Sequence, residues 1–83
     1  MFLHAGNRIS VKKENIIGIF DLDSTTVSKH TRKFLELAEK ENKVINVSYE
    51  LPKSFIVTNE NGNEKVYISQ ISTVTLQKRS NIL

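Results

Sequence analysis

The chain has 83 residues, a formal net charge of +3 and an isoelectric point near 9.3, and 39% of its residues are hydrophobic. This length predicts one domain, residues 1–83, that buries only roughly 60% of the surface its unfolded form exposes, and the mild positive charge permits nucleic-acid binding without requiring it. Because the sequence has no cysteine, no apolar run of about 18 residues and no signal-peptide pattern, disulfides and thiolate metal sites are excluded, and we expect a cytoplasmic protein that does not enter the membrane.

Three short strands are predicted in the first quarter of the chain, and they are expected to form an antiparallel meander. Residues 2–5 form the first strand, and Gly6 with Asn7 supplies a turn that tolerates positive φ angles. In residues 8–12 apolar and polar side chains alternate, which is typical of a strand with one solvated face. After a polar turn, the apolar residues 16–20 predict a buried strand in which Gly18 marks a bulge or a close backbone approach.

One long helix is predicted from about Thr26 to Asn42. Ser24 or Thr25 is expected to cap its beginning, because a hydroxyl oxygen can accept a hydrogen bond from the first free backbone N–H groups. Asn42 is suited to end it, since asparagine tolerates the left-handed conformation. The apolar positions that recur at helical spacing are Val27, Phe34, Leu37 and Ala38.

The only proline of the chain separates two further strands. Apolar and polar residues alternate over residues 45–49, which predicts a half-buried strand that ends near Tyr49. Pro52 has no N–H to donate to a sheet and pushes the residue before it towards an extended or turn geometry. The chain is therefore expected to turn at Pro52, and a more apolar strand is expected to begin near Ser54.

The last third of the chain predicts a hairpin followed by a short helix. The Asn-Gly pair inside residues 59–63 is a strong turn signal, and it is followed by a strand around residues 66–68. A helix over residues 72–79 is expected to bury Val74, with Leu76 less well placed. The elements together predict an α+β fold with small antiparallel strands in two groups around one central helix.

An apolar strand followed by Asp21 and Asp23 looks like the nucleophile motif of haloacid-dehalogenase-type phosphatases. Such enzymes need a parallel sheet and further acidic metal ligands, but no aspartate follows Thr25 in this chain. The two histidines, His4 and His30, are isolated and lack metal-ligand spacing. We therefore predict a non-enzymatic protein without a metal or cofactor, and phosphatase chemistry is a remote alternative.

Basic residues that could contact phosphate occur in loops and in the long helix. The loop cations are Lys12, Lys13 and Lys53. A second group, in the first half of the helix, comprises Lys29, Arg32 and Lys33. Cations near a helix N-terminus oppose the helix dipole by roughly 0.3–1 kcal/mol each, and a bound anion would relieve this. The alternative is a solvated charged face, because acidic residues follow in the same helix.

Several segments, in order and spacing, match a known family over nearly the whole chain. They are Leu3-His4 before Gly6, residues 16–21, residues 52–58, residues 67–69 and residues 72–79. On these residues the chain resembles the RemA/RemB family of small bacterial extracellular matrix regulators, and most of all its RemB branch. The resemblance implies a LytTR-like fold, a cytoplasmic location and a ring-shaped homo-oligomer that binds promoter DNA and activates matrix genes.

The sequence departs from the RemA branch at two places where that branch carries arginines. That branch has an arginine where this chain has Asn15, and an arginine pair where this chain has Leu51 and Pro52. Arginine can bind phosphate through two hydrogen bonds, whereas leucine and proline cannot. Two hypotheses therefore stand: a ring-forming, DNA-binding transcriptional regulator, or an interaction module that assembles with a RemA-like paralogue and does not contact DNA itself.

Overall fold

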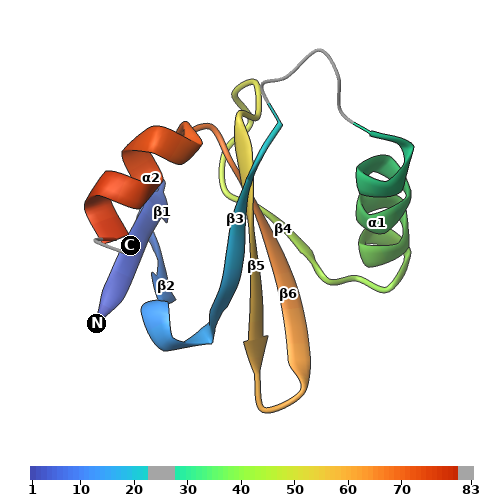
Figure 1. Ribbon diagram of the computed structural model, residues 1–83, viewed down its shortest axis with the longest axis horizontal. Helices are drawn as coiled ribbons and strands as arrows, with labels where there is room; N and C mark the ends of the chain where they lie inside the picture. Colours follow the sequence, from blue (N-terminus) through green and yellow to red (C-terminus); the bar gives the residue numbers. More distant parts are fainter. Residues whose placement is uncertain (23–27, 81–83) are drawn as a thin grey trace.

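A computed structural model of the protein describes residues 1–22 and 28–80 (Figure 1). The elements within this part are β1 (Phe2–Gly6), β2 (Ile9–Lys12), the 3₁₀ helix η1 (Lys13–Asn15), β3 (Ile16–Asp21), α1 (Lys29–Lys40), β4 (Val44–Asn46), β5 (Ser54–Glu60), β6 (Asn63–Ser69) and α2 (Thr73–Ser80). Strands in two groups, one long helix and a short C-terminal helix confirm the predicted α+β class.

The strands form two sheets, and their pairing differs from the predicted meander. β1 and β2 make an antiparallel two-stranded sheet, whereas β3 leaves them and joins a four-stranded sheet of order β3-β5-β6-β4. In that sheet β3 and β6 each run antiparallel to β5, and β4 runs parallel to β6. The predicted three-strand meander was wrong, and the pair of β4 with β6 is parallel. The reason is that alternation along a strand determines the face of each side chain but not the neighbouring strand.

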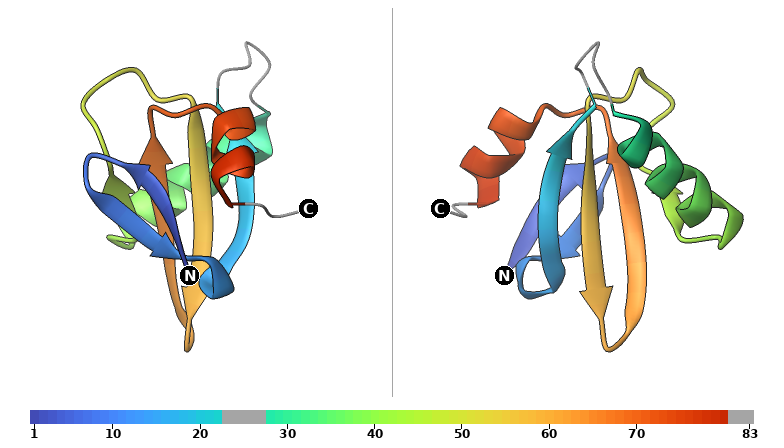
Figure 2. Two further views of the ribbon diagram at one scale, coloured as in Figure 1. Left: turned by 90° about the vertical axis from the view of Figure 1, so that its left-hand side faces the viewer. Right: turned by 45° about the vertical axis from the view of Figure 1, so that its right-hand side comes forward.

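Side chains of β5 point alternately to two cores on opposite faces of the larger sheet. Ile56 is fully buried with Leu3 of β1 and Leu76 of α2, while Phe55 and Val57 are buried on the other face with residues of α1. The β1–β2 hairpin and α2 therefore cover one face, and α1 covers the other (Figures 1 and 2). A central strand buried on both faces explains the unbroken apolar run in β5.

The ends of α1 follow from its capping residues. Ser28 is the N-cap, and its side-chain oxygen accepts a hydrogen bond of 3.1 Å from the backbone N–H of Thr31. At the other end Asn42 has a φ angle of +58°, and the N–H of Lys43 donates to the carbonyl of Ala38 over 2.9 Å. Asn42 thus ends the helix as predicted, but the helix is shorter than the predicted span. The predicted beginning, residues 24–27, lies outside the described residues.

The buried faces of the two helices were predicted only in part. Ala38 of α1 is buried as expected, whereas Leu37 is 50% exposed. In α2, Leu76 is fully buried and Val74 is 60% exposed, so the helix forms as predicted but its predicted buried face was wrong. The docking of α2 against β1 and β3 selects its buried face, and a helix of eight residues offers too little periodicity to reveal that face in the sequence.

β3 is an edge strand of the larger sheet and not the buried strand that its apolar sequence predicts. Ile17 is 62% exposed and Phe20 is 45% exposed. The register of β3 against β5 shifts between Ile16 and Gly18, which confirms the predicted bulge. A Cβ atom on Gly18 would lie 2.7 Å from the ring of Phe20, so the glycine also permits a close approach.

The segment between β4 and β5 projects from the sheet. The predicted strand ends at Asn46, and the side chain of Tyr49 is fully exposed. After Pro52, the N–H of Lys53 donates to the carbonyl of Ser69 over 2.9 Å, and β5 begins at Ser54 as predicted.

Candidate nucleic-acid interface

The structure separates the predicted loop lysines into two places. Lys12 ends β2 and Lys13 begins η1, directly before the Ile16 end of β3. Lys53 lies at the other end of β3, where its carbonyl accepts a hydrogen bond of 2.8 Å from the N–H of Leu22. At about 3.4 Å per residue, the six residues of β3 hold these ends roughly 17 Å apart. Lys12 and Lys13 therefore do not share a patch with Lys53.

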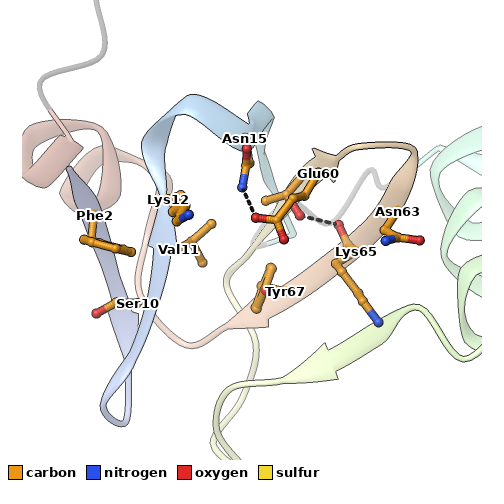
Figure 3. A pocket seen from close by; sticks show the side chains of 10 residues that line it. Phe2, Ser10, Val11, Lys12, Asn15, Glu60, Asn63, Lys65 and Tyr67 are labelled. Carbon is orange, nitrogen blue, oxygen red and sulfur yellow. Dashed lines mark hydrogen bonds between the residues drawn. The ribbon is translucent and has the colours of Figure 1, made fainter.

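The first place is an open groove of about 520 Å³ between the β1–β2 hairpin and the β5–β6 hairpin (Figure 3). It is lined by Phe2, Ser10, Val11, Lys12, Asn15, Thr58, Glu60, Asn63, Lys65 and Tyr67. Lys12 and Lys65 line it from opposite sides. Lys65 was not among the predicted contacts, and the only signal for it is its register position opposite Thr58, which requires the sheet pairing.

Two polar side chains in this groove bind each other. Asn15 Nδ2 donates a hydrogen bond of 3.1 Å to Glu60 Oε1. Asn15 stands where the resemblance to the RemA branch places an arginine. Its amide is bound to the carboxylate of Glu60, and the negative charge of Glu60 partly offsets the positive charges of Lys12 and Lys65. The groove is therefore polar, with only a small excess of positive charge.

The second place is the end of the sheet at which β5 begins. α1 begins towards the same end of the molecule (Figures 1 and 2). Lys53 directly precedes β5, and Lys29, Arg32 and Lys33 lie in the first half of α1; all four side chains are exposed. No acidic residue lies in the first turn of α1, and within the described residues these cations have no ion pair. The N-terminus of α1 carries the positive end of the helix dipole, so its electrostatic potential adds to that of the helix cations. Both attract an anion such as phosphate.

One carboxyl group near the first place has a shifted pKa. The pKa of Glu14 is lowered below its ordinary value of 4.5, first by a hydrogen bond from its own backbone N–H and then by the N-terminal amine. The amine donates to Glu14 Oε1 over 3.4 Å. Both partners are exposed, so this contact ties the chain start to η1 without forming an enclosed site.

The structure describes three of the residues considered for catalysis or metal binding, namely Asp21, His4 and His30. Asp21 ends an antiparallel edge strand, and Asp23 lies outside the described residues. His4 lies on β1 and His30 on α1. Among residues 1–22 and 28–80, no group of three His, Cys, Asp or Glu side chains is placed to hold a metal ion. In the same residues, no helix is long and apolar enough to cross a membrane.

Comparisons with known proteins agree with the resemblance seen in the sequence. The family model described as RemA-like, Extracellular matrix regulatory protein A-like, matches residues 2–79. Extracellular matrix regulatory protein B of Bacillus subtilis (strain 168) is 32% identical over 83 residues, which cover 100% of this chain and 94% of that protein. The chain therefore belongs to the RemA-like family, whose role is regulation of the extracellular matrix.

Proposed function

We propose that the protein is a non-enzymatic, cytoplasmic transcriptional regulator of extracellular matrix genes that binds DNA as a closed homo-oligomer. The observation that supports this proposal is the set of exposed cations just before β5 and in the first half of α1. Lys53, Lys29, Arg32 and Lys33 are exposed there and have no acidic partner in the described part of the chain. Lys12 and Lys13, at the other end of β3, form a second candidate contact surface.

An oligomer accounts for the mild charge of the subunit. One subunit with a net charge of +3 makes few phosphate contacts, and its affinity for DNA would be low. Several copies held together present the same contacts at high effective concentration, so the contacts combine into strong binding that depends on salt. The family regulates extracellular matrix, which supports promoters of matrix genes as the targets.

A second candidate function is an assembly module for a RemA-like paralogue, without DNA contact of its own. The bond between Asn15 and Glu60 favours this alternative, because it occupies a position at which the RemA branch carries an arginine. Leu51 and Pro52 likewise supply no cation at the start of β5. In this function the paralogue would provide the phosphate contacts.

The test is a titration of labelled matrix-gene promoter DNA with the full chain at two salt concentrations. We expect binding at low salt that weakens as salt rises, since phosphate contacts displace counterions. Lys53→Ala should weaken binding, and Lys40→Ala, at the far end of α1, is the matched control. Absence of binding at low salt, or an affinity that does not change with salt concentration, would contradict contact with DNA phosphates. Native mass spectrometry of a mixture with a RemA-like paralogue then tests the assembly function, which predicts mixed oligomers.

A further inference from the structure

The tip of the β5–β6 hairpin (Figure 1) carries the only Asn-Gly step in the sequence, Asn61-Gly62. Both residues are exposed, and they form a two-residue turn between the paired residues Glu60 and Asn63. Their φ angles of +53° and +88° match a type I′ turn, in which φ is positive at both central residues. The turn has no spare residue, so the register of the hairpin depends on the length of the main chain at this point.

An asparagine that precedes a glycine can lose its side-chain amide without an enzyme. In this chain the nitrogen of Gly62 would attack the side-chain carbonyl carbon of Asn61, so that a new C–N bond forms and the bond from that carbon to Nδ2 breaks. The proton of the Gly62 N–H leaves with Nδ2 as ammonia, and a cyclic imide remains. Water then opens the imide at either carbonyl, which yields aspartate or isoaspartate. The net change consumes water and releases ammonia.

The glycine leaves the attacking nitrogen open. Gly62 has no side chain that could shield its N–H from the carbonyl carbon of Asn61. Apart from its chain neighbours, no atom of the described residues lies within 4 Å of the place that a Cβ on Gly62 would take. Asn59 and Asn63, the other two asparagines of the hairpin tip, are also exposed, but each precedes a glutamate. Asn61 is therefore the most reactive asparagine of the hairpin.

The folded turn restrains this reaction. The N–H of Gly62 donates to Asn59 Oδ1 over 2.9 Å, and its nitrogen becomes a nucleophile only after this hydrogen bond is lost and the proton leaves. In a type I′ turn the nitrogen of Gly62 points away from the side chain of Asn61. Ring closure therefore needs rotation about the Cα–C bond of Asn61, which the pairing of Glu60 with Asn63 resists. The reactive geometry arises only when the tip of the hairpin opens locally.

We propose that Asn61 is a site of spontaneous deamidation and that local opening of the hairpin tip sets its rate. The two products differ in their effect on the fold. Aspartate keeps the turn, because an Asp-Gly pair suits the same turn type. Isoaspartate routes the main chain through the side-chain carbon and lengthens it by a CH2 group. Glu60 and Asn63 then lose their present register, and the end of the hairpin separates.

Both products place a carboxylate beside the groove of Figure 3. Glu60 and Asn63, which flank the turn, line that groove together with Lys65. The neutral amide of Asn61 becomes a negative group, so the net charge of the chain falls by one unit from +3. The new charge opposes Lys12 and Lys65, as Glu60 already does, and weakens the attraction of the groove for anions. Deamidation thus changes the charge at this groove and leaves the cations of α1 intact.

Peptide mapping of the full chain by mass spectrometry tests the site. One sample is incubated folded at mildly alkaline pH, and a second is kept unfolded in guanidinium chloride. We expect Asn61 to be converted in both samples, at a rate roughly tenfold lower in the folded one because the tip must open first. Asn59 and Asn63 should keep their amides. No conversion of Asn61 in the folded chain, or equal conversion of all three, would overturn the site, and equal rates in the two samples would overturn the control by opening.

The variant Asn59→Ala tests the restraint directly, because it removes the acceptor of the Gly62 N–H. We expect Asn61 to be converted roughly fivefold faster in the folded variant, the factor that corresponds to the loss of one neutral hydrogen bond, and at the wild-type rate in guanidinium chloride. Asn63→Ala, on the other side of the turn, leaves that acceptor in place and should keep the wild-type rate in both samples. An unchanged rate in folded Asn59→Ala would show that this hydrogen bond does not restrain the reaction.

The two products can be compared in the same protein. Asn61→Asp supplies the aspartate product, and the isoaspartate form is separated from the incubated chain by chromatography. We expect Asn61→Asp to unfold at the denaturant midpoint of the wild type and the isoaspartate form to unfold at a lower midpoint, because only the latter loses the register of the turn. Equal midpoints for the two forms would contradict the change of register.

Discussion

The ring of Phe20 on the edge strand stacks on the ring of Phe55 in the next strand, with centroids 5.0 Å apart and an interplanar angle of 20°. Phe55 is only 4% exposed, because Phe20 covers it from one side and Phe34 of α1 contacts it as well. The stack thus joins the strand edge to the helix-covered core. Phe20 stacks on this core and remains 45% exposed at the edge of the sheet.

The first prediction compares the two stacked residues. Phe55→Ala should lower the free energy of unfolding by about 3–5 kcal/mol, because it leaves a cavity in the core. Phe20→Ala should cost clearly less, since that ring is already 45% exposed. Urea denaturation at one fixed protein concentration measures both values. Equal losses would show that the edge ring is as important for stability as the buried ring.

The second prediction concerns the close approach of Gly18 to Phe20. Gly18→Ala places a Cβ 2.7 Å from the Phe20 ring, so the ring must move away from Phe55. We expect stability to fall by about 1 kcal/mol, which is typical of mild overpacking. In the background of Phe20→Ala the same substitution should cost less. A double-mutant cycle by urea denaturation checks this, and independent effects would rule out the steric coupling.

The third prediction concerns Ser69, a fully buried residue that connects the two sheets. Its hydroxyl donates to the carbonyl of Ala5 over 2.8 Å and accepts from the N–H of Ile71 over 3.0 Å. Ser69→Ala leaves both groups without this partner and should cost about 1–3 kcal/mol. Ser10→Ala, at an exposed position of β2, is the control and should change stability little. The melting temperatures of both variants measure this: Ser69→Ala should melt clearly below the wild type and Ser10→Ala close to it. Equal melting temperatures would contradict the prediction.

The fourth prediction separates the two candidate DNA surfaces. Lys53→Ala and Arg32→Ala should each reduce the salt dependence of DNA binding, by about 0.9 in log–log slope for every phosphate that the variant no longer neutralises. Lys12→Ala and Lys65→Ala, at the other end of β3, should have smaller effects because Glu60 already opposes their charge. Fluorescence anisotropy over a salt series gives the slopes. If Lys12→Ala reduces the slope more than Lys53→Ala does, the DNA interface lies instead at the groove shown in Figure 3.

The fifth prediction follows from the lowered pKa of Glu14. A carboxyl group with a depressed pKa in the folded state stabilises the fold above its unfolded pKa, and this contribution disappears as the pH falls through the folded value. The affected window therefore lies below about pH 4.5, the ordinary value of the group. A titration of Glu14 in the folded protein, followed by NMR, should give a pKa below 4.5. Acetylation of the N-terminus should raise the pKa only partly, because the bond from the backbone N–H of Glu14 remains. A return to the ordinary value would assign the whole shift to the amine.

The sequence by itself determined the local structure of this protein. Alternation and apolar runs predicted the strands, and the Asn61-Gly62 turn forms with φ angles of +53° and +88°. The bulge at Gly18, the helix end at Asn42 and the start of β5 after Pro52 were also correct. These features depend on the conformational limits of single residues and their immediate neighbours, so they can be inferred without knowing the fold.

Only the tertiary structure decided which segments become neighbours. The apolar sequence of β3 suits a central strand, yet the pairing of β5 with β6 leaves β3 at the edge with Ile17 and Phe20 exposed. The same pairing brings Lys65 to the groove of Lys12 and puts Lys53 at the other end of β3. Strand order and helix docking depend on contacts between residues far apart in the chain, and the total burial of apolar surface selects among arrangements that are locally equivalent.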